Sequence, residues 1–183
     1  MRIGLRRWRA SDAEWYAEQS QDPEILKWTS ERPGLHPSEV REAIAAVADD
    51  NSLAWVAVEA DTGQRLGNAA VDIRDGVAEP SYWVAAAARG NGVATEILRL
   101  LVAKTILAGY RRVELVIAEG NAASRRVAEK VGFVMFGFER RRNLGSCVRY
   151  QLPARVVDEL VALADPNSLA SISVGRQPVA EPR

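Results

Sequence analysis

The chain reads Arg89-Gly90-Asn91-Gly92-Val93-Ala94 between a strand-like segment, 81–84, and a helical pattern that runs over 93–108. Glycines in a turn between a strand and a helix let the backbone approach a bound group and leave backbone N–H groups exposed. The positive end of the helix dipole lies behind these groups, so the turn is suited to a phosphate, and Arg89 adds a cation. A tight connection without any ligand explains the same residues equally well.

Two common phosphate-binding motifs do not fit this turn. A nucleotide P-loop would place Gly-Lys-Ser/Thr after it, and this sequence is absent there. A dinucleotide-binding turn would have glycine or alanine at position 95, where the chain has Thr95. A phosphate bound here therefore belongs to a different kind of ligand.

A second informative segment follows the apolar strand pattern 113–117. It reads Asn121-Ala122-Ala123-Ser124-Arg125-Arg126-Val127-Ala128-Glu129-Lys130-Val131-Gly132-Phe133. Arg-x-x-Gly-x-Ala, then a helix, a strand and Asn-x-x-Ser-x-x-Val-x-Glu-Lys-x-Gly-Phe, resembles the GNAT superfamily of acyl-CoA-dependent N-acetyltransferases. The resemblance covers residues 1–152, a single domain by length. It implies acetyl-CoA as co-substrate and no metal.

The resemblance also implies which residues hold coenzyme A. In the family the first loop binds the pyrophosphate, and the second segment flanks the pantetheine arm and the thioester. The implied contacts are Trp83, Val84, Arg89, Gly90, Asn91, Gly92, Val93, Ala94, Asn121 and Ser124. A backbone N–H near Trp83 or Val84, where a bulge interrupts this strand in the family, would polarise the thioester carbonyl.

Two side chains are expected to carry the chemistry. The strand around Glu79, Ala-Glu-Pro-Ser-Tyr-Trp-Val, resembles Ala-Glu-Ile-Gly-Tyr-Trp-Leu of the Rim-type ribosomal-protein N-terminal acetyltransferases, where the glutamate points toward the acceptor amine. Glu79 is therefore the expected base, although Pro80 and Ser81 depart from that pattern and leave its orientation open. An exposed carboxylate at a strand end is the alternative.

The expected acid is Ser124. Many members have alanine there and a tyrosine one turn later, at the position of Ala128, whereas the Rim-type branch has the serine. Residues four apart share a helix face, so a small Ala128 is expected to leave that face open. Ser124 could instead serve only to satisfy a helix amide, and Asn121 is well placed to cap the same helix.

Hydrophobic periodicity and turn residues predict the order of elements. Strands are expected near 3–8, 53–59, 65–73, 78–84, 112–118, 133–141 and 146–152. Helices are expected at 11–19, opened by a capping box at Ser11, from Pro37 to about Asp49, and at 93–108 and 122–130, whereas 22–35 is expected to be rich in loops. The fold is α/β (α+β), a mixed, mainly antiparallel sheet with helices on both faces. The resemblance adds that the two central strands splay apart. Residues 153–183 are expected to form a helix from Pro153 and a weakly ordered tail beyond Pro166.

Composition limits the other possibilities. Among 183 residues, 48% are hydrophobic and 26% charged, and 24 Lys and Arg balance 24 Asp and Glu, so neither a nucleic acid nor a membrane is an expected partner. No apolar stretch is long enough to span a bilayer and the N-terminus lacks a signal-peptide core, so a cytoplasmic protein is expected. A single cysteine, Cys147, and a single histidine, His36, give no disulfide, Cys–His dyad or metal site. A homodimer stays open.

The expected activity is direct transfer of acetyl from acetyl-CoA to an amine in a ternary complex. An α-amine at a protein N-terminus is favoured by the Rim-type resemblance. A small amine, such as an antibiotic or a polyamine, is the alternative acceptor, and a non-catalytic acyl-CoA-binding module is the alternative class. Trp28, between the first two helices, is expected either to border the acceptor pocket or to pack in the core.

Overall fold

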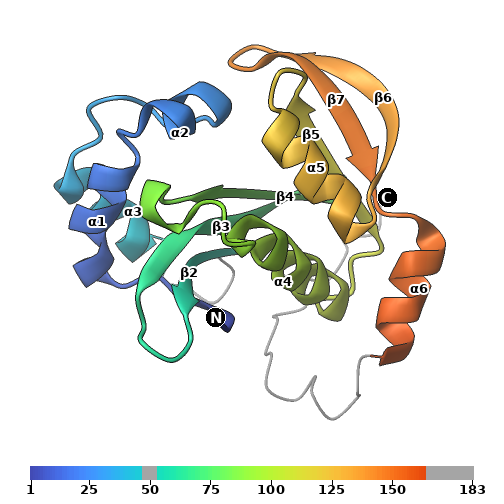
Figure 1. Cartoon of the computed structure of the whole chain (residues 1–183), viewed down its shortest axis with the longest axis horizontal. Helices are drawn as coiled ribbons and strands as arrows, with labels where there is room; N and C mark the ends of the chain where they lie inside the picture. Colours follow the sequence, from blue (N-terminus) through green and yellow to red (C-terminus); the bar gives the residue numbers. More distant parts are fainter. Residues whose placement is uncertain (47–52, 164–183) are drawn as a thin grey trace, which may run out of the picture.

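The computed structural model describes residues 1–46 and 53–163. They form one seven-stranded sheet in the order β1-β2-β3-β4-β5-β7-β6 (Figure 1). Neighbouring strands run antiparallel except β4 and β5, which are parallel. The predicted mixed, mainly antiparallel sheet is therefore confirmed.

The elements fall close to their predicted positions. The strands are β1 Ile3–Arg6, β2 Ala54–Glu59, β3 Arg65–Arg74, β4 Val77–Val84, β5 Arg112–Ala118, β6 Val134–Arg141 and β7 Gly145–Gln151. The helices are η1 Ala10–Asp12, α1 Ala13–Gln19, α2 Pro23–Trp28, α3 Pro37–Ala46, η2 Ala86–Ala88, α4 Val93–Leu107, α5 Ala122–Val131 and α6 Ala154–Leu163. The predicted helix end near Asp49 and the predicted tail beyond Pro166 lie outside the described residues.

Helix α2 lies in the interval that was predicted to be rich in loops. The Asp22 carboxylate accepts hydrogen bonds from the backbone N–H groups of Glu24 and Ile25, and Pro23 occupies the first helical turn. An aspartate cap followed by proline is a recognised start of a helix. The helix has only six residues, so hydrophobic periodicity could not reveal it.

The predicted capping box at Ser11 is also replaced by a different arrangement. Asp12 is buried, and its carboxylate accepts two hydrogen bonds from the Arg6 guanidinium, at 2.7 and 2.9 Å. Arg65 of β3 approaches it at 3.4 Å. Burial acts to raise the pKa of Asp12, but the bonds from Arg6 and from the Arg9 backbone outweigh it, so that pKa is lowered. The start of α1 is thereby fastened to β1 and β3.

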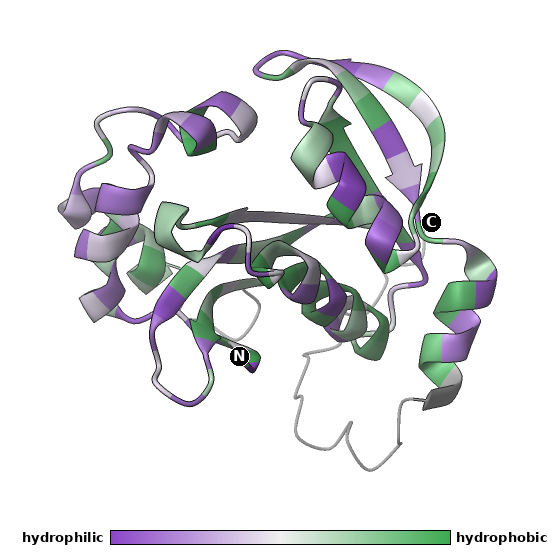
Figure 2. Cartoon of the chain, in the orientation of Figure 1, coloured by the Kyte–Doolittle hydropathy of each residue, from purple (hydrophilic) through white to green (hydrophobic). Residues whose placement is uncertain are grey.

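Helices cover both faces of the sheet because neighbouring strand residues point to opposite sides. Trp83 contacts the rings of Trp15 and Tyr16 in α1, whereas Val84 lies in the core with Val93 and other residues of α4. Figure 2 shows hydrophobic segments concentrated in the central strands and in α4. Helix α6, which follows residue 152, packs against the core of the domain and buries Val157 there.

The central strands splay as predicted. Strands β4 and β5 pair only at Val77 with Arg112 and at Ala78 with Val113. Beyond that point residues of both strands line one cavity, so the splay opens the sheet at its centre. The strand order thus places a cavity between β4 and the unit formed by β5, β7 and β6.

The bulge expected near Trp83 and Val84 is absent from the pairing of β4 with β3. That register continues without a shift from Gly67–Val84 to Arg74–Val77. The backbones approach closely instead, because a Cβ atom at Gly67 would lie 2.2 Å from the carbonyl oxygen of Trp83. Position 67 therefore has no room for a side chain.

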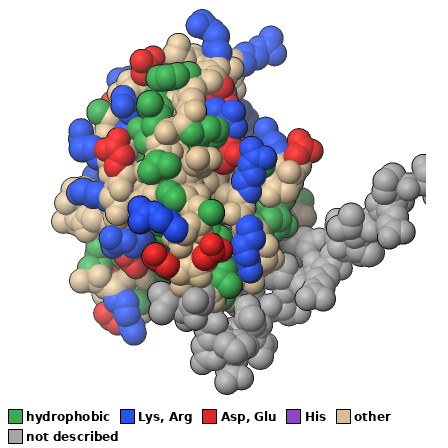
Figure 3. Space-filling view, turned by 90° about the vertical axis from the view of Figure 1, so that its right-hand side faces the viewer, with side chains coloured by type: hydrophobic (Ala, Val, Ile, Leu, Met, Phe, Trp, Pro, Cys, Tyr) green, Lys and Arg blue, Asp and Glu red, His purple; other side chains and the backbone are tan. Residues whose placement is uncertain are grey.

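Strand β6 forms the outer edge of the sheet and carries exposed apolar side chains. They are Val134, Met135, Phe136 and Phe138, with exposed fractions from 38% to 67%. Figure 3 views the molecule from this side and shows hydrophobic side chains beside arginines and lysines. Apolar side chains on a free strand edge are typical of a contact surface, and the homodimer stays a prediction. Within residues 1–46 and 53–163, no helix has the length and apolar character needed to cross a membrane.

Candidate active site

The splay of β4 and β5 opens into a cavity of about 620 Å³. Strands β3, β4 and β5 form its floor, α2 and the following loop form one wall, and α5 with the β6–β7 turn forms the other. Its volume lies in the range of small-molecule sites, roughly 300–1,000 Å³. The predicted catalytic residues Glu79 and Ser124 both line it, as do Trp28, Trp83, Val84, Arg89, Ala94 and Asn121.

The predicted phosphate-binding turn lies beside this cavity and has a suitable backbone. Gly90 and Gly92 adopt φ values of 81° and 77°, in the left-handed region that favours glycine. Helix α4 begins at Val93 with Gly92 as its N-cap, so its first N–H groups have no partner within the helix. Asn91 steadies the turn through a hydrogen bond from its Nδ2 to the carbonyl oxygen of Arg89, at 3.2 Å. The turn therefore presents free donors at the positive end of a helix dipole.

The side chain of Arg89 bonds to two groups of the protein. Its Nη2 donates to Oδ1 of Asp22 at 2.7 Å, and its Nε donates to the carbonyl oxygen of Val84 at 3.1 Å. The bond from Arg89 lowers the pKa of Asp22, the residue that caps α2. Arg89 thus joins the turn to α2, and its contact with a phosphate stays a prediction.

Ser124 is held by two neighbours. Its backbone N–H donates to Oδ1 of Asn121 at 3.1 Å, which makes Asn121 the N-cap of α5. Its hydroxyl lies 3.1 Å from the hydroxyl of Tyr82, on the opposite side of the splay. The helix amide is thus satisfied by Asn121, and the Ser124 hydroxyl remains available to the cavity.

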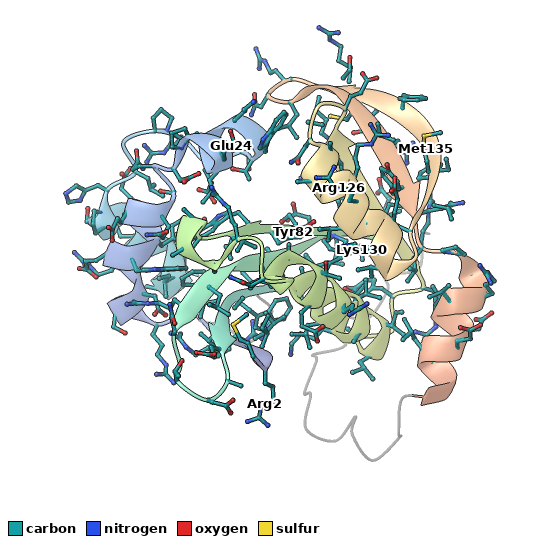
Figure 4. The ribbon with its side chains drawn as sticks, viewed as in Figure 1. Arg2, Glu24, Tyr82, Arg126, Lys130 and Met135 are labelled. Carbon is teal, nitrogen blue, oxygen red and sulfur yellow. The ribbon has the colours of Figure 1, made fainter. Side chains whose placement is uncertain are left out.

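Tyr82 was not identified as a site residue from the sequence. It lies three residues after Glu79 in β4, so the two side chains point to opposite faces of the strand. Figure 4 shows Tyr82 in the space between β4 and α5. Burial raises the pKa of Tyr82, although its bond with Ser124 partly offsets this.

The expectation that Ala128 leaves the helix face open is wrong. Ala128 is fully buried in the core cluster that includes Phe133 and Tyr150. Val127 lines the cavity together with Ser124. The helix is rotated so that positions 124 and 127 face the cavity, whereas position 128 faces the core.

Glu79 lies in the cavity but is not free. Its two carboxylate oxygens accept hydrogen bonds from Nη1 and Nη2 of Arg141, both at 2.7 Å. The side chains of Glu79 and Arg141 are 25% and 32% exposed. The bond to Glu79 is the main cause of a raised pKa at Arg141. Glu79 is therefore a paired cavity carboxylate rather than an exposed strand end.

Arg141 is itself fixed by a row of alternating charges on that face of the sheet. The row runs Glu79, Arg141, Glu139, Arg149, Glu114, Arg112. Its successive closest contacts are 2.7, 2.6, 3.4, 2.6 and 2.8 Å. The row joins β4, the β6–β7 hairpin and β5, and its first pair, Glu79–Arg141, spans 62 residues, so no local motif could have revealed it.

Trp28 borders the cavity rather than packing in the core. Its indole Nε1 donates to Oε2 of Glu24 at 2.9 Å, and the Lys27 ammonium lies 4.4 Å from its ring centroid. A Cβ atom at Gly120, before α5, would lie 3.2 Å from Cη2 of Trp28. Trp28 thus spans from the α2 wall to the loop before α5, and its contact with a substrate stays a prediction.

The Trp83 side chain is buried and serves packing. Its Nε1 donates to Oε1 of Glu31 at 3.1 Å, and the Tyr16 hydroxyl donates to the same oxygen. Burial and the Glu31 charge raise the pKa of Tyr16, so it remains neutral. Only the backbone of Trp83 is therefore available to a cofactor.

The remaining reactive residues lie elsewhere. Burial raises the pKa of the Cys147 thiol, which favours its unreactive neutral form. His36 lies before α3, where its Nδ1 is 2.8 Å from the Ser38 hydroxyl. Within the two described ranges, no group of three or more His, Cys, Asp or Glu side chains is placed to hold a metal ion.

A splayed sheet, a glycine turn before a helix and a cavity between them define a class of acyl-CoA-dependent enzymes. Residues 2–134 match the acetyltransferase (GNAT) domain family. The chain therefore belongs to the GNAT acetyltransferases and is an N-acetyltransferase that uses acetyl-CoA.

Solved structures with the same fold act on different acceptors. The chain is 15% identical to a ribosomal-protein-S5-alanine acetyltransferase from Vibrio fischeri, covering 82% of this chain and 92% of that one with a TM-score of 0.72. It is 21% identical to RimJ from Mycobacterium smegmatis in complex with CoA-disulfide, covering 88% of each chain with a TM-score of 0.72. It is 17% identical to a spermidine N-acetyltransferase from Vibrio cholerae in complex with CoA and spermine, covering 85% and 97% with a TM-score of 0.74. No curated protein matches the chain in sequence.

Proposed function

We propose that the protein acetylates the α-amine of a protein N-terminus by direct transfer from acetyl-CoA in a ternary complex. The observation that carries this acceptor class is the charge balance of the cavity. The lining has four carboxylates, Glu24, Glu31, Asp72 and Glu79, and four guanidiniums, Arg74, Arg89, Arg141 and Arg142. A polycationic acceptor would favour an excess of carboxylates, whereas an acceptor with one amine has no such need.

Glu79 would act from the floor of the cavity and Ser124 from the wall formed by α5. Glu79 would accept the proton of the amine through its remaining lone pairs or through one water, because Arg141 occupies one position on each oxygen. The hydroxyl of Ser124 would protonate the departing thiolate. The turn 89–94 would bind the pyrophosphate of acetyl-CoA, which places the thioester near the splay.

An α-amine suits a weakly basic site. Its pKa is about 7.7–8.0, against about 10.4 for a lysine side chain. The difference of roughly 2.5 units corresponds to about 3.4 kcal/mol of deprotonation. Glu79 therefore needs less basic strength to deprotonate an α-amine than to deprotonate a lysine side chain.

A small amine is the second candidate, and one residue favours it. Glu31 accepts hydrogen bonds from the neutral donors of Tyr16 and Trp83 on a single oxygen, Oε1. Within the described part of the chain no arginine or lysine forms a salt bridge with it. Its second oxygen could hold an ammonium group of an acceptor with two amines.

Thiol release from acetyl-CoA tests the acceptor. The panel contains a peptide with a free N-terminus, the same peptide with a blocked N-terminus and an internal lysine, and spermidine. We expect kcat/KM to be highest for the free N-terminus by at least about tenfold, a transition-state difference of about 1.4 kcal/mol. Mass spectrometry locates the acetyl group. A preference for spermidine would replace the N-terminal acceptor with the small amine.

A further inference from the structure

The hydroxyl groups of Tyr82 and Ser124 meet across the open centre of the sheet. Tyr82 comes from β4 and Ser124 from the first turn of α5, 42 residues later in the chain. Their oxygens are 3.1 Å apart, and both residues line the cavity. This contact is not needed to cap α5, because Asn121 already accepts the Ser124 amide.

We propose that Tyr82 supplies the proton that Ser124 passes to the departing thiolate of coenzyme A. The inference rests on the proposed role of Ser124 in the acetyl transfer. Tyr82 acts through Ser124 rather than on the substrate, so it is a positioning and proton-supplying residue.

The relative acid strengths of the two hydroxyls carry the argument. An aliphatic hydroxyl is a much weaker acid than a phenol, whose ordinary pKa is about 10. A serine alone would have to become an alkoxide when it protonates a thiolate, and thiols have a pKa of only about 8.5. A phenol that donates to the serine oxygen at the same time moves the negative charge to a group that carries it more easily.

Two protons move when the tetrahedral intermediate collapses. The C–S bond of the tetrahedral intermediate breaks and its electron pair goes to sulfur. Sulfur takes the hydroxyl proton of Ser124, while the Ser124 oxygen takes the hydroxyl proton of Tyr82. The resulting phenolate recovers a proton from water, and the proton lost by the amine leaves through Glu79 or water. The products are the amide and the free thiol.

The surroundings of Tyr82 suit this task. Its ring packs against both core clusters, one beneath α5 and the other beneath α4, so the hydroxyl is held in one place. Burial raises the pKa of Tyr82 and its bond with Ser124 partly offsets this, so the phenol is protonated at neutral pH and remains a stronger acid than an aliphatic hydroxyl. The tyrosine that many family members carry on the helix has no room at the buried Ala128. In this chain the phenol that reaches Ser124 comes from β4 instead.

Substitution of the two hydroxyls tests the relay. We expect Tyr82→Phe and Ser124→Ala each to lower kcat by about 10²-fold, the low end of general-acid catalysis, with KM for acetyl-CoA unchanged. Because the two groups act as a unit, the double variant should lose no more than the poorer single variant. Tyr110→Phe, at a tyrosine outside the cavity lining, serves as the matched control and should retain full kcat.

Fluorinated tyrosines at position 82 separate proton supply from packing. Each fluorine makes the phenol more acidic while the ring and its hydroxyl remain. Proton supply predicts that kcat changes progressively along the series, whereas a hydroxyl that only orients Ser124 predicts a flat series. A flat series, additive losses in the double variant, or full kcat in Tyr82→Phe would overturn the proposal.

The acceptor is chosen so that this test does not depend on the acceptor class. Turnover is measured with whichever amine of the panel reacts fastest, and with water as acceptor if none reacts. If spermidine replaces the N-terminal peptide, the proposed acceptor fails while the relay is still measured. If Ser124→Ala retains full kcat, the proposed role of Ser124 fails and the relay fails with it.

Discussion

Glu79–Arg141 and Tyr82–Ser124 both cross the splay, the first from β4 to β6 and the second from β4 to α5, and they differ in kind. Glu79–Arg141 is an ion pair, with 25% and 32% of its side chains exposed, on the face that carries the charged row. Tyr82–Ser124 is a neutral contact between hydroxyls, beside the core and next to α5. Both begin after Ala78, where the backbone pairing of β4 with β5 ends.

The difference separates two tasks that the reaction requires. Two hydrogen bonds from Arg141 hold the Glu79 carboxylate in one orientation, and Arg141 is itself bonded to Glu139. A neutral hydroxyl pair can move a proton without first separating charges. We therefore expect Glu79–Arg141 to affect binding and deprotonation of the acceptor amine. We expect Tyr82–Ser124 to affect protonation of the departing thiolate.

The largest effect should come from a variant that touches neither contact. Gly92→Glu puts a side chain at a φ of 77° and a negative charge where the pyrophosphate is expected. Affinity for acetyl-CoA should fall at least about 100-fold, or 2.7 kcal/mol. Without bound acetyl-CoA, neither contact can contribute to acetyl transfer. Calorimetry measures the affinity, and Gly92→Ala provides the backbone strain without the charge. Unchanged affinity in Gly92→Glu would remove this turn from the cofactor site.

Glu79→Gln should give the next largest effect, on turnover alone. Loss of a general base should lower kcat by about 10²-fold while the affinity for acetyl-CoA stays the same. The loss should be greater with a lysine side chain than with an α-amine, because lysine holds its proton more tightly. Steady-state kinetics with both acceptors measures it, and Asp61→Asn in the β2–β3 turn is the control. Full activity with both acceptors would leave positioning as the source of catalysis.

Arg141→Gln should have a smaller effect that falls on the acceptor. It removes the double hydrogen bond to Glu79, so KM for the acceptor should rise by about 3–10-fold, or 0.7–1.4 kcal/mol. Stability should fall as well, because Glu79 and Glu139 both lose their hydrogen bonds to Arg141. Arg140→Gln, an exposed neighbour on the same strand, is the matched control. An effect of equal size in both variants would assign it to surface charge instead of to Glu79.

Asn121→Ala should affect stability more than turnover. It removes the cap of α5 but leaves the Ser124 hydroxyl beside Tyr82. The free energy of unfolding should fall by about 1 kcal/mol, the usual value of a lost N-cap. Thermal or denaturant unfolding measures this change. A loss of kcat as large as that of Ser124→Ala would show that the cap itself places the hydroxyl.

The features predicted from the sequence depend on short local motifs. The features that were missed depend on contacts between residues far apart in the chain. The glycine turn, the Asn121 cap and the splayed strands follow from short motifs and the family resemblance. Arg141 and Tyr82 meet Glu79 and Ser124 across 62 and 42 residues of sequence, and only the folded sheet brings them together. The position of Ala128 was also predicted wrongly. The spacing of four residues placed it on the same helix face as Ser124, but it did not show that Ala128 packs in the core.

The bond between Arg89 and Asp22 joins the phosphate turn to the helix that forms the acceptor wall. A pyrophosphate that attracts the same guanidinium would compete with the N-cap of α2. Occupancy of one pocket would then alter the shape of the other, and thermodynamic linkage requires that the influence run equally in both directions. Arg89 would then couple the affinity for acetyl-CoA to the affinity for the acceptor.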